Sequence, residues 1–127
     1  MREDIIIEFA QLINQVAPNY DVIIGVERSG DRLIRALMRM EVLNIDPTKY
    51  LPSRAIYGRN LENKKVLVID DIARHGGKIL EVAKLVKEQG ASHVDTMVYV
   101  IDEVLKPNIN FYCRELPPDT LHVIQSR

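Results

Sequence analysis

The sequence lacks the features that mark several classes of protein. Cys113 is the only cysteine among 127 residues, so neither an intramolecular disulfide nor a multi-cysteine metal site can form. Apolar runs stay far below the roughly 18 to 20 residues that cross a bilayer. Acidic and basic residues nearly cancel to a net charge of -1, which argues against a general nucleic-acid binder with the usual basic excess.

These absences predict where the protein works. The chain starts with charged residues among apolar ones, a pattern that argues against a cleaved export signal. A single free thiol suits a reducing compartment. We therefore expect a cytoplasmic protein whose partners include neither a membrane nor nucleic acid.

Length and periodicity predict one α/β domain over residues 1–127. A chain of this size buries roughly two thirds of its unfolded surface, enough for one core. Apolar residues recur with helical spacing over residues 3–17, 31–42 and 78–89. Short apolar runs predict strands over 21–26, 66–69 and 94–101, with a further strand over 54–57. This alternation predicts a three-layer sandwich around a mainly parallel sheet, followed by a Pro-rich tail.

Two loops follow predicted strands, at residues 27–30 and 70–78. In parallel sheets, ligands bind outside the carboxyl ends of the strands. The second loop carries Asp70 and Asp71, then a glycine pair, then a helix. Glycines expose successive amide N–H groups and the helix adds its positive end, so the loop favours an anion such as phosphate. The two carboxylates suit sugar hydroxyls or a hydrated magnesium ion.

This second loop resembles the phosphoribosyl pyrophosphate signature of type I phosphoribosyltransferases. Residues 26–30 resemble the pyrophosphate loop of that family. The tail, with Lys106 before Pro107 and then residues 116–125, is similar to the base-recognition end of the small xanthine-guanine enzymes. The three segments follow the family's order and cover most of residues 20–125, so the resemblance implies the type I fold with a reduced hood.

The resemblance also implies roles for individual residues. The catalytic residues would be Asp70, Asp71 and Arg74, with Mg²⁺ held by the two aspartates. The ribose 5-phosphate loop would comprise Ala73, Arg74, His75, Gly76, Gly77 and Lys78. The pyrophosphate loop would comprise Glu27, Arg28, Ser29 and Gly30. The base would be bound by Lys106, Leu121 and His122.

The implied reaction is substitution at the anomeric carbon of the ribose. Phosphoribosyl pyrophosphate and a nucleobase or related heterocycle would give a nucleoside 5'-monophosphate, within nucleotide metabolism and closest to purine salvage. The family resemblance suggests a homodimer.

The sequence departs from the family pattern at three places. Arg74, His75 and Lys78 stand where hydroxyl residues usually complete the phosphate cradle, and Arg74 replaces a common base-contacting aspartate. A negatively charged acceptor, or one other than a purine, is therefore left open. Only eight residues separate Tyr57 from Val66, where the family usually inserts a closing lid, so the chemistry is slow or a neighbouring subunit lends its lid. Leu121 replaces an aromatic residue, which weakens base stacking by about 1 kcal/mol.

Two further hypotheses stand beside the enzyme. A non-catalytic member of the same fold would bind a nucleotide or phosphoribosyl pyrophosphate as a regulator; the altered loop and short lid favour it, whereas the acid pair favours the enzyme. Residues 66–71 also resemble the start of a phospho-acceptor receiver domain, but too few residues follow Asp71 for that fold. In a plainer interpretation, the acid pair is a helix N-cap with a solvated neighbour.

Overall fold

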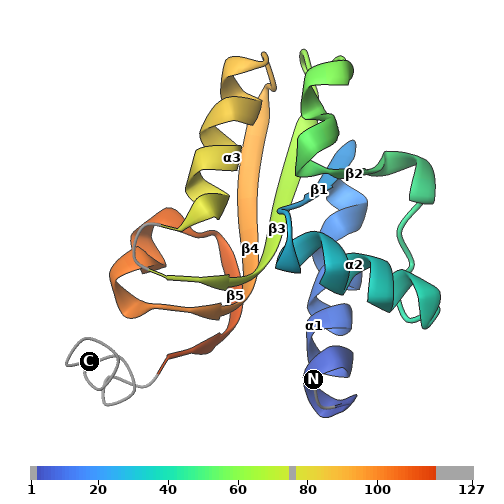
Figure 1. The fold of residues 1–127 in the computed structure, drawn as a ribbon, viewed down its shortest axis with the longest axis vertical. Helices are drawn as coiled ribbons and strands as arrows, with labels where there is room; N and C mark the ends of the chain where they lie inside the picture. Colours follow the sequence, from blue (N-terminus) through green and yellow to red (C-terminus); the bar gives the residue numbers. More distant parts are fainter. Residues whose placement is uncertain (1–2, 75–76, 117–127) are drawn as a thin grey trace.

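A parallel five-stranded sheet forms the centre of the computed structural model, which describes residues 3–74 and 77–116 (Figure 1). The strands lie in the order β2-β1-β3-β4-β5, and every neighbouring pair is parallel. Their bounds are β1 Val22–Gly25, β2 Tyr50–Pro52, β3 Lys65–Ala73, β4 His93–Ile101 and β5 Phe111–Glu115. The α-helices are α1 Glu3–Val16, α2 Ser29–Arg39 and α3 Lys78–Glu88. The α/β class and the parallel sheet predicted from the sequence are confirmed.

Short 3₁₀ turns complete the connections. They are η1 Ala17–Asn19, η2 Pro47–Lys49, η3 Ser53–Gly58 and η4 Glu103–Asn108. Within the described ranges, no helix combines the length and apolar character needed to cross a membrane.

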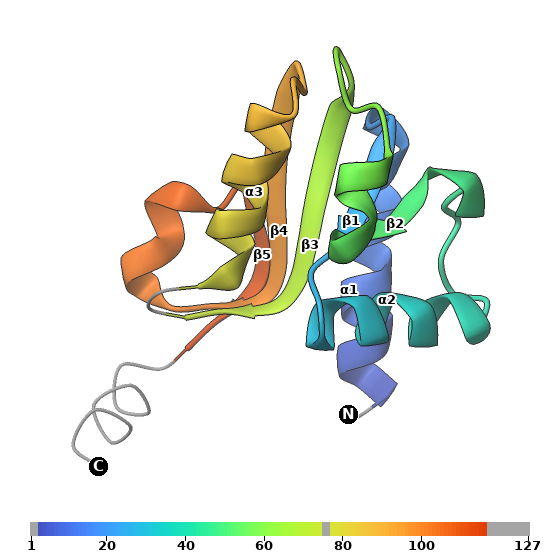
Figure 2. The same ribbon diagram turned by 45° about the horizontal axis from the view of Figure 1, so that its top comes forward.

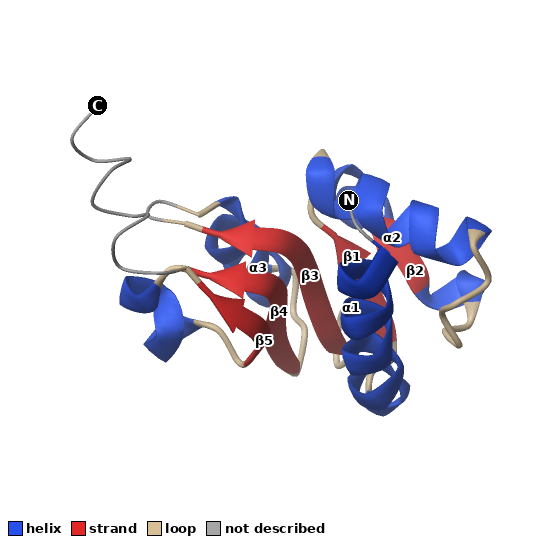
Figure 3. Cartoon of the chain, turned by 90° about the horizontal axis from the view of Figure 1, so that it is seen from below, coloured by secondary structure: helices blue, strands red, loops and turns tan. Residues whose placement is uncertain are grey.

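Both faces of the sheet are covered because alternate residues of β3 point to opposite sides. Val66 and Val68 join the apolar cluster beneath α3, whereas Leu67 and Ile69 join the cluster beneath α1 and α2. Helices therefore flank the strands on both sides (Figure 3). A strand buried on both faces reads as a continuous apolar run, which is why β1, β3 and β4 were visible in the sequence.

The strand predicted over residues 54–57 is wrong. These residues belong to η3, and β2 lies just before them at Tyr50–Pro52. Ile56 still buries its side chain, but from the 3₁₀ turn, where it joins the cluster beneath α3. Two prolines, Pro47 and Pro52, read as breakers in the sequence and concealed the short strand. A proline is tolerated in an edge strand because the N–H that it lacks would face solvent and would form no hydrogen bond within the sheet.

Strand β3 is longer than its apolar run. It continues through the acid pair to Ala73, with Asp70 opposite Val98 and Ala73 opposite Ile101 of β4. The predicted loop at 70–78 is therefore shorter, because its first four residues are strand. In Figure 2 the lower end of β3 curves toward the turn that follows β4. There the Asp102 N–H donates to the Ala73 carbonyl at 2.8 Å.

The remaining boundaries shift by smaller amounts. Helix α2 begins at Ser29 and ends at Arg39, so part of the predicted loop at 27–30 is the first turn of that helix. Strand β5 was missed because Arg114 and Glu115 interrupt its apolar pattern, as an edge strand allows. Gly90 lies just after α3 with a φ of +96°, a conformation that ends the helix.

Gly30 lets α2 lie directly against the end of β3. A Cβ atom added at Gly30 would lie 2.8 Å from Asp70 Oδ1 and 3.0 Å from both Asp70 Cα and the Ile69 carbonyl oxygen. Two of these three atoms belong to the backbone and cannot swing away. Only glycine therefore fits between the helix and the strand.

We expect Gly30→Ala to lower the free energy of unfolding by about 1–3 kcal/mol, because the helix must move off the strand. Urea denaturation measures this. Gly58→Ala is the matched control: no heavy atom lies within 4 Å of its added Cβ, so its effect should stay within about 0.5 kcal/mol. Equal stability of Gly30→Ala and wild type would contradict the close packing.

Candidate functional site

The acid pair lies inside β3, beside the first turn of α2. Ser29 Oγ donates to Asp71 Oδ1 at 2.9 Å. This hydrogen bond joins two residues that are 42 positions apart in the chain. It brings the predicted pyrophosphate loop against the predicted ribose-binding carboxylates, at the carboxyl edge of the sheet.

Neighbouring backbone groups hold the two carboxylates. Asp70 Oδ1 accepts from the Asp71 N–H, and Asp71 Oδ1 accepts from the Ile72 N–H, both at 2.8 Å. Asp70 is 7% exposed, while Asp71 is half-buried. The plainer interpretation of the pair as a helix N-cap is wrong, because α3 begins only at Lys78 and is preceded by Gly77.

Burial raises the pKa of Asp70 to about 8. The hydrogen bond and the negative charge of Asp71 contribute to this rise, whereas the Asp71 N–H and the Lys78 charge oppose it. The raised pKa means that Asp70 binds a proton at neutral pH in the ligand-free protein. A cation placed against this carboxylate would favour its ionised form.

The pair can contribute to a magnesium site but cannot complete one. Carboxylate oxygens are ligands that Mg²⁺ accepts, and this ion usually keeps several waters and binds substrate phosphates as well. Among residues 3–74 and 77–116, no group of three or more His, Cys, Asp or Glu side chains gathers to hold a metal. Asp70 and Asp71 therefore fit a magnesium ion whose other ligands come from water and substrate.

The phosphate loop is shorter than predicted, because it comprises only the residues between the end of β3 and the start of α3. Ala73 is buried as the last residue of β3, so the sequence placed it wrongly in the loop. Arg74 and Lys78 are exposed on either side of the loop, and Lys78 opens α3. A Cβ on Gly77 would lie 3.0 Å from the Arg74 carbonyl oxygen, so the chain turns tightly here. His75 and Gly76 lie outside the described residues.

The predicted base-binding residues are only partly described. Lys106 lies in η4, pairs with Glu115 at the end of β5 and sits 6.0 Å from the centre of the Tyr112 ring. Within the described ranges no hydrogen bond or ion pair joins Lys106 to the acid pair. Leu121 and His122 lie outside the described residues.

Glu27 pairs with Arg54, a contact that the sequence did not predict. Its Oε1 accepts from the Arg54 N–H at 2.6 Å, and its Oε2 pairs with the Arg54 guanidinium. Ser53 Oγ accepts from the Glu27 N–H at 3.0 Å. Burial would raise the pKa of Glu27, but the hydrogen bonds and charge of Arg54 outweigh it and lower that pKa.

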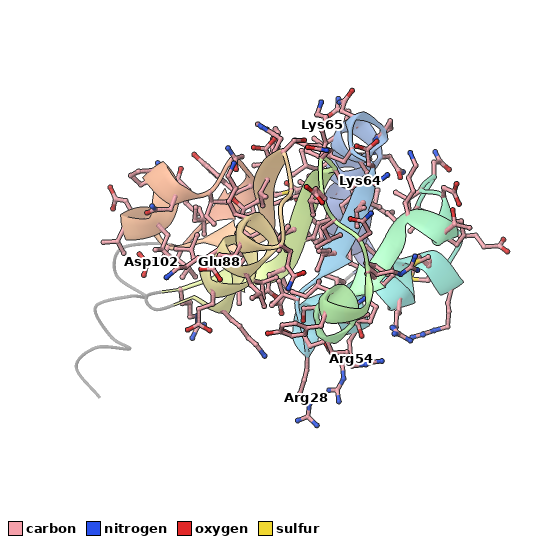
Figure 4. The ribbon with its side chains drawn as sticks, turned by 90° about the horizontal axis from the view of Figure 1, so that it is seen from above. Arg28, Arg54, Lys64, Lys65, Glu88 and Asp102 are labelled. Carbon is pink, nitrogen blue, oxygen red and sulfur yellow. The ribbon has the colours of Figure 1, made fainter. Side chains whose placement is uncertain are left out.

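This pairing brings a second arginine to the pyrophosphate loop. Arg54 is the second residue of η3, and Arg28 is the residue after Glu27. Both side chains are exposed and extend from the same side of the molecule (Figure 4). Ser53 and Arg54 follow the carboxyl end of β2, the place where ligand-binding residues are expected. The sequence did not reveal this because it predicted the strand at residues 54–57.

A buried carboxylate fixes β2 to α2. Asp31 accepts a hydrogen bond from the Tyr50 hydroxyl and another from Arg35 Nε at 3.0 Å. A Cβ on Gly25 would lie 2.1 Å from the Tyr50 hydroxyl oxygen, so only glycine leaves room for this contact. Since η3 follows β2 directly, the contact also positions Ser53 and Arg54.

Comparison with known proteins identifies a matching family and several relatives. The family model described as "Phosphoribosyl transferase domain" matches residues 48–124. The orotate phosphoribosyltransferase of Enterococcus faecalis is 28% identical over 129 residues, covering 95% of this chain and 60% of that protein. The transcriptional regulator GfcR of Methanococcoides burtonii is 30% identical over 109 residues, covering 76% of this chain and 51% of that protein. The chain thus spans about half to three fifths of these curated relatives.

Solved structures show the same fold. A hypoxanthine phosphoribosyltransferase from Staphylococcus aureus superposes with a TM-score of 0.67, over 91% of this chain and 74% of that one. The identity is only 14%, so the likeness concerns the fold and not the substrate.

We expect protein stability to fall as pH rises, more in wild type than in Asp70→Asn. The folded pKa of Asp70, about 8, lies above the unfolded value of about 3.9. The folded state therefore holds a proton that the unfolded state has lost, and this stabilisation disappears as pH rises through 8. Urea denaturation at pH 5 and pH 9 measures the difference. Wild type should lose at least about 1.4 kcal/mol relative to the variant, the equivalent of one pKa unit.

The control for this pH series is Glu62→Gln, which removes an exposed carboxylate. It should follow the wild-type pH dependence. The same pH dependence in wild type and Asp70→Asn would contradict the raised pKa.

Proposed function

This chain belongs to the phosphoribosyl transferase domain family, and we propose that it transfers a phosphoribosyl group from phosphoribosyl pyrophosphate to a nucleobase or related heterocycle. The products would be a nucleoside 5'-monophosphate and pyrophosphate. The observation that carries this proposal is the hydrogen bond from Ser29 to Asp71. It joins the start of α2 to the end of β3, and these two segments would hold different parts of one sugar diphosphate.

Each loop would hold one part of the substrate. Amides of residues 74–78, with Arg74 and Lys78, would bind the 5-phosphate at the start of α3. Asp70 and Asp71 would accept hydrogen bonds from the ribose hydroxyls. Arg28 and the amides after it would face the pyrophosphate.

The reaction breaks the bond between the anomeric carbon and pyrophosphate and forms a bond from that carbon to a nitrogen of the base. Arg28 and Arg54 would stabilise the charge that accumulates on the departing pyrophosphate. Glu27 would position Arg54 and not bind the diphosphate itself, since its carboxylate is occupied and would repel an anion. Mg²⁺, held at Asp70 and Asp71, would supply further neutralisation of the pyrophosphate charge.

The acceptor is proposed to be an anionic base. Curated relatives such as the Enterococcus faecalis protein are named for orotate, a base that carries a carboxylate. Arg74 is exposed three residues after Asp71, and a cation there would favour such an acceptor over a neutral purine. A base panel that includes orotate and hypoxanthine tests this choice.

A second candidate function is regulation without turnover. GfcR, a transcriptional regulator, is among the relatives, and the short connection between η3 and β3 leaves little chain for a lid. The protein would then bind phosphoribosyl pyrophosphate or a nucleotide without releasing pyrophosphate. In either case we propose a homodimer, in which a neighbouring subunit helps to cover the site, and a cytoplasmic setting that suits the free thiol of Cys113.

We expect the double variant Asp70→Asn, Asp71→Asn to bind phosphoribosyl pyrophosphate with Mg²⁺ at least tenfold more weakly, about 1.4 kcal/mol. The variant loses the charge that would hold the ion. Calorimetric titration measures the affinity. The pair Glu62→Gln, Glu88→Gln removes two exposed carboxylates elsewhere and should bind like wild type.

Two outcomes would decide between the candidate functions. Equal affinity in wild type and the Asp70, Asp71 double variant would remove the acid pair from the site. Saturable binding without pyrophosphate release, across the panel of bases, would replace the enzyme by the regulator.

We expect Arg54→Met to weaken pyrophosphate binding about tenfold, because a cation beside Arg28 is lost. Glu27→Gln should weaken it less, since Arg54 keeps its charge when its position loosens. Arg39→Met, at the far end of α2, is the control and should bind like wild type. Equal losses in Glu27→Gln and Arg54→Met would show that Arg54 serves only to hold η3.

A further inference from the structure

A cavity of about 190 Å³ lies at the opposite edge of the sheet, where β1 and β2 begin. Its walls come from the starts of these strands and from the segment 59–64, which leads into β3. None of the residues assigned to the candidate site lines it. Figure 4 shows Lys64 and Lys65 well separated from Arg28 and Arg54.

Three cations from different parts of the chain line this cavity: Lys49 before β2, and Arg59 and Lys64 before β3. Arg59 and Lys64 are exposed, and neither forms an ion pair with another described residue. Lys49 Nζ donates to the Tyr20 carbonyl at 3.4 Å, a long hydrogen bond, and its charge also interacts with the Asp46 carboxylate. Asp21 is the one acidic residue in the lining, and its Oδ2 already accepts from the Lys65 N–H at 2.9 Å.

The cavity also offers a neutral donor and an apolar wall. Asn60 Oδ1 accepts from the Glu62 N–H at 3.0 Å, which fixes the amide and leaves its NH₂ group to donate elsewhere. Leu51 and Leu61 line the cavity with buried side chains. An apolar wall keeps water from screening the cations fully, so an anion held here is attracted more strongly than at an open surface.

We propose that this cavity binds a small phosphate-bearing anion, separately from the substrate. Cations from two sides and a directed amide match the several oxygens of a phosphate, each of which accepts hydrogen bonds. The volume is several times the roughly 30 Å³ that one water occupies in the liquid, so it holds a phosphate with a small organic group against Leu51 and Leu61. The ligand is inorganic phosphate or a phosphomonoester.

A ligand in the cavity could act on the candidate site through the chain segment that connects the two. The segment 59–64 connects η3, which carries Arg54, to β3, which carries the acid pair. An anion that ties Arg59 and Lys64 to Lys49 would hold this connection against β2. The cavity is therefore placed to act as a regulatory site.

The test is an NMR titration of the ¹⁵N-labelled chain with inorganic phosphate, at ionic strength held constant with chloride. Amide signals of Asn60, Leu61 and Lys64 report on the cavity, while those of Arg28 and Ser29 report on the opposite edge. We expect saturable shifts at the cavity amides. The double variant Arg59→Met, Lys64→Met should weaken binding there at least tenfold and leave the affinity reported by Arg28 and Ser29 unchanged.

The matched control is Lys84→Met, Lys87→Met on α3, which removes the same charge from an exposed helix face. It should titrate like wild type at the cavity. Phenyl phosphate distinguishes the two sources: tighter binding than inorganic phosphate assigns a phosphomonoester, and equal binding assigns phosphate itself. The proposal is overturned if the cavity amides respond no more to phosphate than to chloride, or respond equally in both double variants. Failure here leaves the proposed transferase function untouched, because the amides at Arg28 and Ser29 are read separately.

Discussion

The contact between the first turn of α2 and the end of β3 is the constraint on which the candidate site depends. Gly30 permits it, since any side chain there would meet the backbone of Ile69 and Asp70. Because β1 and β3 are adjacent parallel strands, with Gly25 opposite Ile69, the loops after them emerge at one edge. The helix dipole of α2 and the carboxylates of β3 then face one another across a single hydrogen bond, from Ser29 to Asp71.

At the carboxyl edge of the sheet, few charged side chains are buried without a partner of opposite charge. Burial leaves Asp70 with a raised pKa and therefore a proton at neutral pH, which reduces repulsion toward an approaching phosphate. Glu27 is occupied by Arg54, so the loop that would meet pyrophosphate presents arginine and not carboxylate. Ionisation of Asp70 would then be coupled to the arrival of a cation, as the proposed binding of magnesium with a diphosphate requires.

The parts of the fold that the sequence predicted were those buried on both faces. Residues 66–69 and 97–101 form continuous apolar runs, and α3, a helix with one apolar face, follows the first of them. The two edge strands were not predicted. Prolines before and within β2 read as breakers, and Arg114 and Glu115 interrupt the apolar pattern of β5. The acid pair was found, but its place inside β3 was not, because charged residues at a strand end resemble a loop. The tie between Glu27 and Arg54 depends on the position of β2, and no local pattern carries that information.

The most direct test of the account is a crystal structure of the chain with a bound nucleoside 5'-monophosphate and magnesium. We expect the 5-phosphate on the backbone amides between Arg74 and Lys78, with the ribose hydroxyls within hydrogen-bond distance of Asp70 or Asp71. We also expect Arg28 and Arg54 to border the space left for pyrophosphate. A nucleotide bound elsewhere, with both carboxylates facing only solvent or protein, would contradict the proposed site.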